Sequence, residues 1–274
     1  MTEAAARPLS APGRAPLFVR LSAALHVAGA GVCLVAPRAW PLVVATIIPD
    51  HLLLAWGSLR PRSALVGPNL RRLPDRAAEN EVALTFDDGP DPRTTPRVLD
   101  LLDARRARAT FFCVGRKAEQ HPDLVREIAR RGHRVENHSF GHAGTFCCWS
   151  PDAQAGDIDR AQATLARLAG AVPRYFRAPA GLRSPWLDGV LRSRGLTLVS
   201  WTRRGLDTIS RRPEAVARRL TRGLAAGDIL VLHDGGGAVG PEALPRLLDA
   251  IESARLRSVP LPDPEPVDAA GAAA

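Results

Sequence analysis

The stretch EVALTFDDGPD, residues 81–91, decides the fold of this chain. An apolar run at 82–86 ends in two adjacent carboxylates, Asp87 and Asp88, and a Gly-Pro turn follows. This pattern is typical of a buried strand that ends at the edge of a sheet. Because the strand ends there, one carboxylate can bind a metal ion while the other transfers protons. Alternatively, the pair forms an Asx-type turn that only caps the strand.

From residue 82 onward, apolar runs alternate with helix-like segments, which predicts a mainly parallel sheet. Several of the helix-like segments begin with proline, which the first turn of a helix tolerates. Such a sheet is a closed barrel or doubly wound, and ligands then bind beyond the carboxyl ends of the strands. The predicted strands are 82–86, 109–114, 133–137, 174–178, 196–201, 228–232 and 257–261, and the predicted helices are 95–106, 122–131, 151–168, 185–194, 213–225 and 241–255.

Polar side chains follow several of these strands. His138 and His142 come after the third strand at a spacing that lets two imidazoles reach one ion, although ordinary surface histidines also show it. Arg177 follows the fourth strand, Asp207 follows the fifth, and His233 closes the sixth. One Asp with two His leaves open positions for water and substrate, as catalytic zinc and related ions require. The second carboxylate is then free to act as base, and His233 as acid.

Composition argues against several other classes of protein. The apolar content of 46% is sufficient for a sizeable core. The net charge of +9 is spread along the chain, Lys117 is the only lysine, and no basic run occurs, so we expect no nucleic-acid partner. The cysteines Cys33, Cys113, Cys147 and Cys148 show no Cys-x-x-Cys spacing, which predicts free thiols.

The N-terminal region predicts an association with a membrane. Two apolar stretches at 17–36 and 39–59 are about long enough to cross a bilayer. The second contains Asp50, which costs about 2.5–3.5 kcal/mol near mid-membrane, so it is either re-entrant or turns Asp50 and His51 toward the first helix. Alternatively, both stretches are amphipathic helices packed on the domain.

Arginines flank these apolar stretches unevenly, with more of them before the first and after the second than between them. If both cross a bacterial-type inner membrane, this distribution predicts that both ends of the chain lie in the cytoplasm. If only the first crosses it, the catalytic part could face outward.

Five motifs resemble, in order, those of the metal-dependent polysaccharide deacetylases of carbohydrate esterase family 4, the NodB-homology domain. They are TFDDGPD at 85–91, HSFGH at 138–142, RAPAG at 177–181, the 201–207 segment and LHD at 232–234. The resemblance covers about residues 80–260. It implies a distorted (β/α)7-type barrel, here preceded by an apolar helical hairpin. The predicted parts are a disordered 1–16, a membrane-associated 17–60, a linker 61–79, a catalytic domain 80–262 and a disordered tail 263–274.

The resemblance implies a hydrolase that removes N-acetyl or related N-acyl groups from amino sugars of a polysaccharide or oligosaccharide. By position, Asp88, His138 and His142 would hold a divalent metal ion. Zn²⁺ is the expected ion, and Co²⁺, Ni²⁺ or Fe²⁺ accept the same ligands. The oxyanion would lie at the metal and at a backbone N–H near Ala180.

The remaining catalytic roles are also implied by the resemblance. Asp87 would take a proton from the attacking water, and Arg177 would hold Asp87 in place as a carboxylate. His233, kept charged by Asp207, would protonate the leaving amine.

Substrate contacts are assigned in the same way. The Pro179–Gly181 loop and Trp201 would contact the sugar, and Leu232 would line a small pocket for the acyl methyl group. Ala180 and Thr208 stand where the family often has aromatic residues. Both positions shape the sugar groove, so these departures concern the usual long-polymer substrates rather than the reaction.

Two alternatives to a polymer deacetylase stay open. One is a deacetylase or deformylase of a lipid-linked amino sugar at the membrane surface, suggested by the apolar N-terminus. The other is an inactive, membrane-tethered sugar-binding domain.

Overall fold

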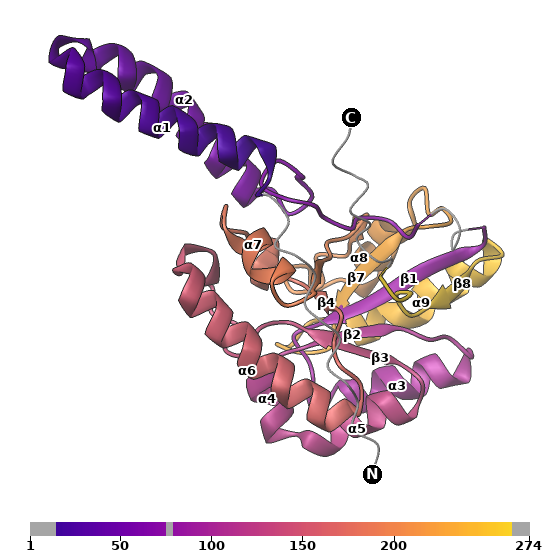
Figure 1. The fold of residues 1–274 in the computed structure, drawn as a ribbon. Coiled ribbons are helices and arrows are strands. Elements are labelled where there is room, and N and C mark those ends of the chain that lie inside the picture. Colours follow the sequence, from indigo (N-terminus) through magenta and orange to yellow (C-terminus); the bar gives the residue numbers. More distant parts are fainter. Residues whose placement is uncertain (1–14, 75–78, 265–274) are drawn as a thin grey trace.

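The computed structural model describes residues 15–74 and 79–264, and it consists of a helical hairpin and an α/β part (Figure 1). The hairpin projects away from the α/β part, which carries the sheet. The two ends predicted to be disordered, 1–16 and 263–274, lie mostly outside the described residues.

A curled parallel sheet forms the centre of the α/β part. Its middle strand, β1 (Glu81–Asp87), pairs with β2 (Thr110–Cys113) on one side and with β7 (Ile229–His233) on the other. Along the sheet the order is β5-β4-β3-β2-β1-β7-β6, and β8 also pairs with β1. Within the described residues all named strands pair in parallel, and the sheet has the curled form predicted for a distorted (β/α) barrel. The other strands are β3 (Arg134–Asn137), β4 (Tyr175–Phe176), β5 (Thr197–Leu198), β6 (Arg203–Arg204) and β8 (Arg257–Val259).

Helices connect the strands and cover the outer face of the sheet (Figure 1). One α-helix and one strand of this part were not predicted, and both lack an apolar period. The six-residue α4 begins at a glycine, and β6 consists of two arginines defined by their pairing with Leu230 and Val231. The helices of this part are α3 (Thr95–Ala104), α4 (Gly115–Gln120), α5 (Pro122–Arg130), α6 (Pro151–Ala169), α7 (Leu187–Arg192), α8 (Pro213–Thr221) and α9 (Gly240–Ser253).

Successive apolar side chains of β1 and β7 point to opposite faces of the sheet, and they belong to two separate apolar clusters. Leu84, Phe86 and Leu232 belong to the cluster beneath the covering helices, whereas Ala83 and Val231 belong to the cluster inside the curl of the sheet. Side chains two residues apart on a strand share a face, so the last residues of β1 and β7 point into the curl. The hydrophobic pattern thus decides which polar side chains reach the interior.

The N-terminal hairpin pairs α1 (Leu17–Val35) with α2 (Trp40–Leu59) through a short turn. The two helices approach closely, because a Cβ added at Gly29 would lie 2.7 Å from Cγ1 of Val43. Most of their apolar side chains are exposed. By length and composition, both helices could cross a membrane.

The chain after α2 runs along the α/β part. The N–H of Leu70 donates to the carbonyl of Leu198, and the N–H of Leu73 donates to the carbonyl of Gly227. The N–H of Arg183 donates to the carbonyl of Ser58, at the end of α2. The C-terminal end of the hairpin is therefore fixed to the α/β part by backbone hydrogen bonds.

Candidate active site

The two carboxylates after the apolar run of β1 occupy different positions. Asp87 is the last residue of β1, is 3% exposed and lies level with His233 of β7 in the strand register. Asp88 follows in the left-handed region, with φ 70°, and its side chain is partly exposed. In a continuing strand, Asp88 would point to the opposite face of the sheet from Asp87. The left-handed turn at Asp88 changes this direction, so both carboxylates line one cavity.

Asp88 lies beside the two histidines that follow β3. Its Oδ1 is 3.0 Å from Nε2 of His142 and 3.4 Å from Nε2 of His138. Nδ1 of His138 lies 2.8 Å from the carbonyl oxygen of Arg177. A carbonyl oxygen only accepts, so Nδ1 donates to it and Nε2 is the ring nitrogen that faces Asp88.

This donor set fits a divalent metal ion. Ligand atoms about 2.0–2.1 Å from a tetrahedral zinc ion are roughly 3.3 Å apart, close to the separations seen here. A hydrogen bond from the second imidazole nitrogen to a backbone carbonyl is the usual support of a metal-binding histidine. Burial alone would raise the pKa of Asp88, but His138 and His142 outweigh burial and hold that pKa well below its usual range. The carboxylate is therefore ionised, as a metal ligand must be.

A buried arginine fixes Asp87. Nη1 of Arg177, just after β4, donates to Oδ1 of Asp87 and to Oγ1 of Thr85, each at 2.7 Å. Its Nη2 donates to the carbonyl of Ser200 at 2.9 Å, and its guanidinium lies 4.1 Å from the centroid of the Phe112 ring. Burial lowers the pKa of Arg177, and the attraction of Asp87 opposes that change. Because Oδ1 of Asp87 accepts from Arg177, Oδ2 is the oxygen available to a substrate or water.

His233 is paired with Asp207. Nδ1 of His233 donates to Oδ1 of Asp207 at 2.9 Å, and the backbone N–H of His233 donates to Oδ2 at 2.8 Å. Asp207 is 1% exposed. Burial on its own lowers the pKa of His233, but Asp207, together with Asp87, outweighs burial and raises it above its ordinary value. The pairing with Asp207 therefore favours the protonated form of His233 and leaves its Nε2 facing the cavity.

These side chains surround a cavity of about 210 Å³. Ala180, Gly181 and Trp201 lie on its wall, whereas Pro179 is buried and Arg177 and Asp207 lie behind the lining. The lining residues are Asp87, Asp88, His138, His142, Ala180, Gly181, Trp201, Arg204, Thr208, Val231 and His233. The cavity is smaller than the roughly 300–1,000 Å³ of typical ligand clefts, so it suits a single small substituent.

The structure corrects the placement of Leu232. Leu232 is fully buried in the cluster beneath the helices, and Val231 lies on the cavity wall instead. Side chains two residues apart on a strand lie on the same face. His233 lines the cavity, so Val231 does too, and Leu232 between them points to the opposite face.

Backbone strain gathers around the cavity. Asp88, His142 and Ala180 all line it and have positive φ values of 70°, 50° and 55°. Non-glycine residues in this region cost about 1–3 kcal/mol each and persist where surrounding contacts hold them, commonly at functional sites.

Residues without a predicted role contact the backbone around Asp88, one of the proposed metal ligands. Nζ of Lys117, on the unpredicted α4, donates to the carbonyl of Asp88 at 2.6 Å. Oγ1 of Thr95 donates to Oδ2 of Asp234 at 2.6 Å, and burial raises the pKa of Asp234 to about 7. A Cβ added at Gly235 would lie 2.3 Å from the carbonyl oxygen of Asp88, so only glycine allows this approach. The one signal in the sequence was that Lys117 is the only lysine.

The end of the hairpin lies against the cavity wall. A Cβ added at Gly181 would lie 2.6 Å from the Trp201 ring and 2.8 Å from Cβ of Pro61, so these residues are in close contact. Nη1 of Arg62 donates to the carbonyl of Thr202 at 2.9 Å. Two residues that follow α2 therefore support the loops that line the cavity.

Comparisons with known proteins identify relatives of this chain. Residues 75–199 match the family model described as polysaccharide deacetylase. A chitooligosaccharide deacetylase from Sinorhizobium fredii is 36% identical over 157 residues, which are 56% of this chain and 72% of the relative. A peptidoglycan-N-acetylglucosamine deacetylase from Bacillus cereus is 31% identical over 188 residues, 66% of this chain and 67% of the relative.

A solved structure shows the same fold. The family 4 carbohydrate esterase from Streptomyces lividans in complex with acetate superposes with a TM-score of 0.62 at 32% identity. The match covers 66% of this chain and 93% of that one.

Proposed function

Because this chain belongs to the polysaccharide deacetylase family, hydrolases that cleave the amide bond of N-acetylated sugars, we propose that it removes N-acetyl groups from an amino-sugar glycan with the help of a divalent metal ion. One observation carries the proposal. Asp87, Asp88, His138, His142 and His233 come from three separate strand ends and line one small cavity. This arrangement offers a metal-ligand set, a base and an acid within reach of one amide.

The donor set of Asp88, His138 and His142 fits a zinc-type ion. Such an ion, when bound, would polarise the amide carbonyl and acidify a water molecule. Asp87 accepts a proton from the attacking water through Oδ2, since Arg177 holds Oδ1. Arg177 also keeps the carboxylate oriented, because three acceptors besides Asp87 fix the guanidinium. A backbone N–H near Ala180 would stabilise the developing oxyanion.

His233 completes the reaction from the neighbouring strand. Its Nδ1 proton is held by Asp207, so Nε2 of the imidazolium faces the cavity and gives its proton to the leaving nitrogen. Protonation of that nitrogen allows the C–N bond to break and the free amine to leave. Val231 would contact the acyl group.

Acyl release from a panel of N-acylated sugars tests the proposal. The full chain in detergent should release acetate from N-acetylated chito-oligosaccharides, lose activity with a chelator and recover it with Zn²⁺ or Co²⁺. Asp87→Asn should lower kcat by about 10²–10⁴-fold while bound metal is unchanged, because a general base contributes about that much. Asp123→Asn is the matched control, since the side chain of Asp123 is 93% exposed. No acyl release from any sugar would favour the inactive sugar-binding alternative.

A second candidate function is deacylation of a lipid-linked amino sugar. It is supported by the contact of Pro61 and Arg62 with the loops that line the cavity, directly after α2. If the hairpin is embedded in a bacterial-type inner membrane, the cavity lies near the bilayer surface. Flanking residues suit this embedding: Trp40 and Trp56 are exposed at opposite ends of α2, and Arg60 lies over the Trp56 ring at 5.3 Å.

The arginines around the hairpin support one orientation in a membrane. Arg20 and Arg60 lie at the end nearest the α/β part and Arg38 in the distal turn, with further arginines after α2. This bias favours a cytoplasmic catalytic part when both helices span. Product analysis with polyprenyl-linked and soluble forms of one N-acetylated or N-formylated sugar separates the candidates. A preference for the soluble form would contradict the lipid-linked function and leave the deacetylase activity standing.

A further inference from the structure

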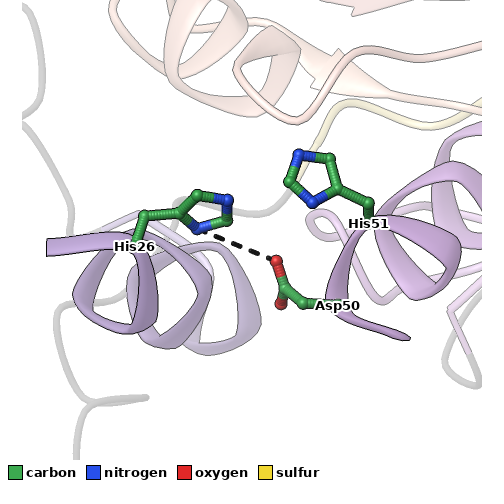
Figure 2. A group of neighbouring side chains, drawn as sticks. All are labelled: His26, Asp50 and His51. Atoms are coloured by element: carbon green, nitrogen blue, oxygen red, sulfur yellow. Dashed lines mark ion pairs between the residues drawn. The ribbon is translucent and has the colours of Figure 1, made fainter. Parts of the chain in front are cut away.

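A second group of side chains that could hold a metal ion lies in the N-terminal hairpin (Figure 2). His26 comes from α1, and Asp50 and His51 are adjacent on α2. One candidate ligand atom from each lies within 4.8 Å of the others. The two imidazole centroids are 5.0 Å apart, and Figure 2 shows both rings above the Asp50 carboxylate. Three residues from two helices therefore face one point.

Each of the two histidines has its Nδ1 at a backbone carbonyl, as metal-binding histidines commonly do. Nδ1 of His26 lies 2.8 Å from the carbonyl of Ser22, and Nδ1 of His51 lies 3.0 Å from the carbonyl of Ile47. Since carbonyl oxygens only accept, both Nδ1 atoms carry protons, and in the neutral rings both Nε2 atoms have free lone pairs. A backbone carbonyl that holds Nδ1–H is the same support that His138 has in the catalytic cavity.

Asp50 is buried, and within the part of the chain that the structure describes its carboxylate has one hydrogen-bond donor, Ser22. It is 8% exposed, and Oγ of Ser22 donates to its Oδ2 at 2.7 Å. Nδ1 of His26 is 3.9 Å from that oxygen, which is too long for a hydrogen bond. Most side chains around the cluster on both helices are apolar. A carboxylate in such surroundings is costly unless a positive charge compensates it.

We propose that His26, Asp50 and His51 form a second divalent-cation site that joins α1 to α2. Two imidazoles and one carboxylate select a zinc-type ion over Mg²⁺ or Ca²⁺, which prefer all-oxygen ligands. Ligand atoms around zinc are roughly 3.3 Å apart, so the three side chains close by about 1.5 Å on binding. The ion links residues 24 positions apart in sequence, from His26 to Asp50, and so holds the hairpin together.

Metal stoichiometry tests this site independently of activity. The full chain in detergent is stripped with chelator, incubated with Zn²⁺, freed of excess metal and analysed by mass spectrometry for zinc per chain. We expect two ions in the wild type, one in H138A/H142A, one in H26A/H51A and none when all four histidines are replaced. H121A is the matched control, because His121 belongs to neither cluster, and it should keep both ions.

Heating gives a second readout that separates a metal site from a merely structural hairpin contact. In the H138A/H142A background, Zn²⁺ should raise the unfolding temperature, and adding Asp50→Asn should abolish the rise. The amide oxygen of the substituted side chain still accepts the hydrogen bond from Ser22, so loss of the Ser22 contact cannot explain the result. Zinc absent from H138A/H142A, or an equal rise after the Asp50→Asn substitution, would overturn the proposal. Either outcome would leave the catalytic metal site unaffected.

Discussion

Replacement of Asp207 by Asn should shift the pH dependence of catalysis without removing a group that touches the substrate. His233 must be protonated to donate to the leaving nitrogen, so activity falls as pH rises through its pKa. Asp207 raises that pKa against the opposing effect of burial. The variant therefore loses activity first on the alkaline side.

The size of the shift follows from the contact. A hydrogen bond to a charged group contributes about 1.5–3 kcal/mol, and about 1.4 kcal/mol corresponds to a tenfold change in an equilibrium constant. Losing the charge of Asp207 should lower the pKa of His233, because the pair is buried and poorly screened. At a pH above both values, kcat/KM should fall about 10–100-fold.

The assay is the profile of kcat/KM for acetate release from pH 5 to pH 9. We expect the alkaline limb of Asp207→Asn to move toward acid, with activity at low pH closer to the wild type. Asp152→Asn, an exposed carboxylate in the first turn of α6, is the control and should leave the profile unchanged. Circular dichroism and metal content establish that the variant is folded and loaded. An unmoved alkaline limb in a folded variant would refute the role of His233 as acid.

Two further predictions concern neighbours of the reacting groups. Val231→Phe should reduce kcat/KM for N-acetyl substrates by filling the cavity, whereas Leu232→Ala should leave specificity unchanged and lower the free energy of unfolding by about 2–5 kcal/mol. Steady-state kinetics and thermal unfolding of both variants check this, and the reverse pattern would restore Leu232 to the acyl pocket. Lys117→Met should weaken zinc binding about 10–100-fold by releasing the carbonyl of Asp88, with exposed Arg116→Met as control. Equal zinc affinity in both variants would contradict a positioning role for Lys117.

The sequence predicted those parts of the site that depend on one element at a time. An apolar run ending in polar residues marks a strand end whatever the rest of the chain does, and this located Asp87 and His233. The parallel α/β sheet also followed, because alternation of apolar runs and helix-like segments has few other packing solutions.

Features that depend on two elements at once were missed or misplaced. Whether Val231 or Leu232 faces the cavity depends on which alternate side chains of β7 lie on the inner face of the curled sheet. A run in which every residue is apolar does not reveal this. The donation from Lys117 to Asp88 requires the packing of α4 against the loop after β1, and α4 has no apolar period of its own. Similarly, no motif in the sequence links His26 to a partner, and only the pairing of α1 with α2 brings it to Asp50 and His51.

The central position of β1 has a consequence for synthesis of the chain. All the proposed metal ligands precede residue 143, whereas β7, which flanks β1 and carries the proposed proton donor, ends at residue 233. The proposed ligand residues are therefore all synthesised well before the strand that the proposed reaction also needs. Until β7 arrives, one side of β1 lacks its longest partner and offers unpaired backbone groups to other strands. Ribosome-stalled fragments that end between these points should be the form of this protein most prone to aggregate.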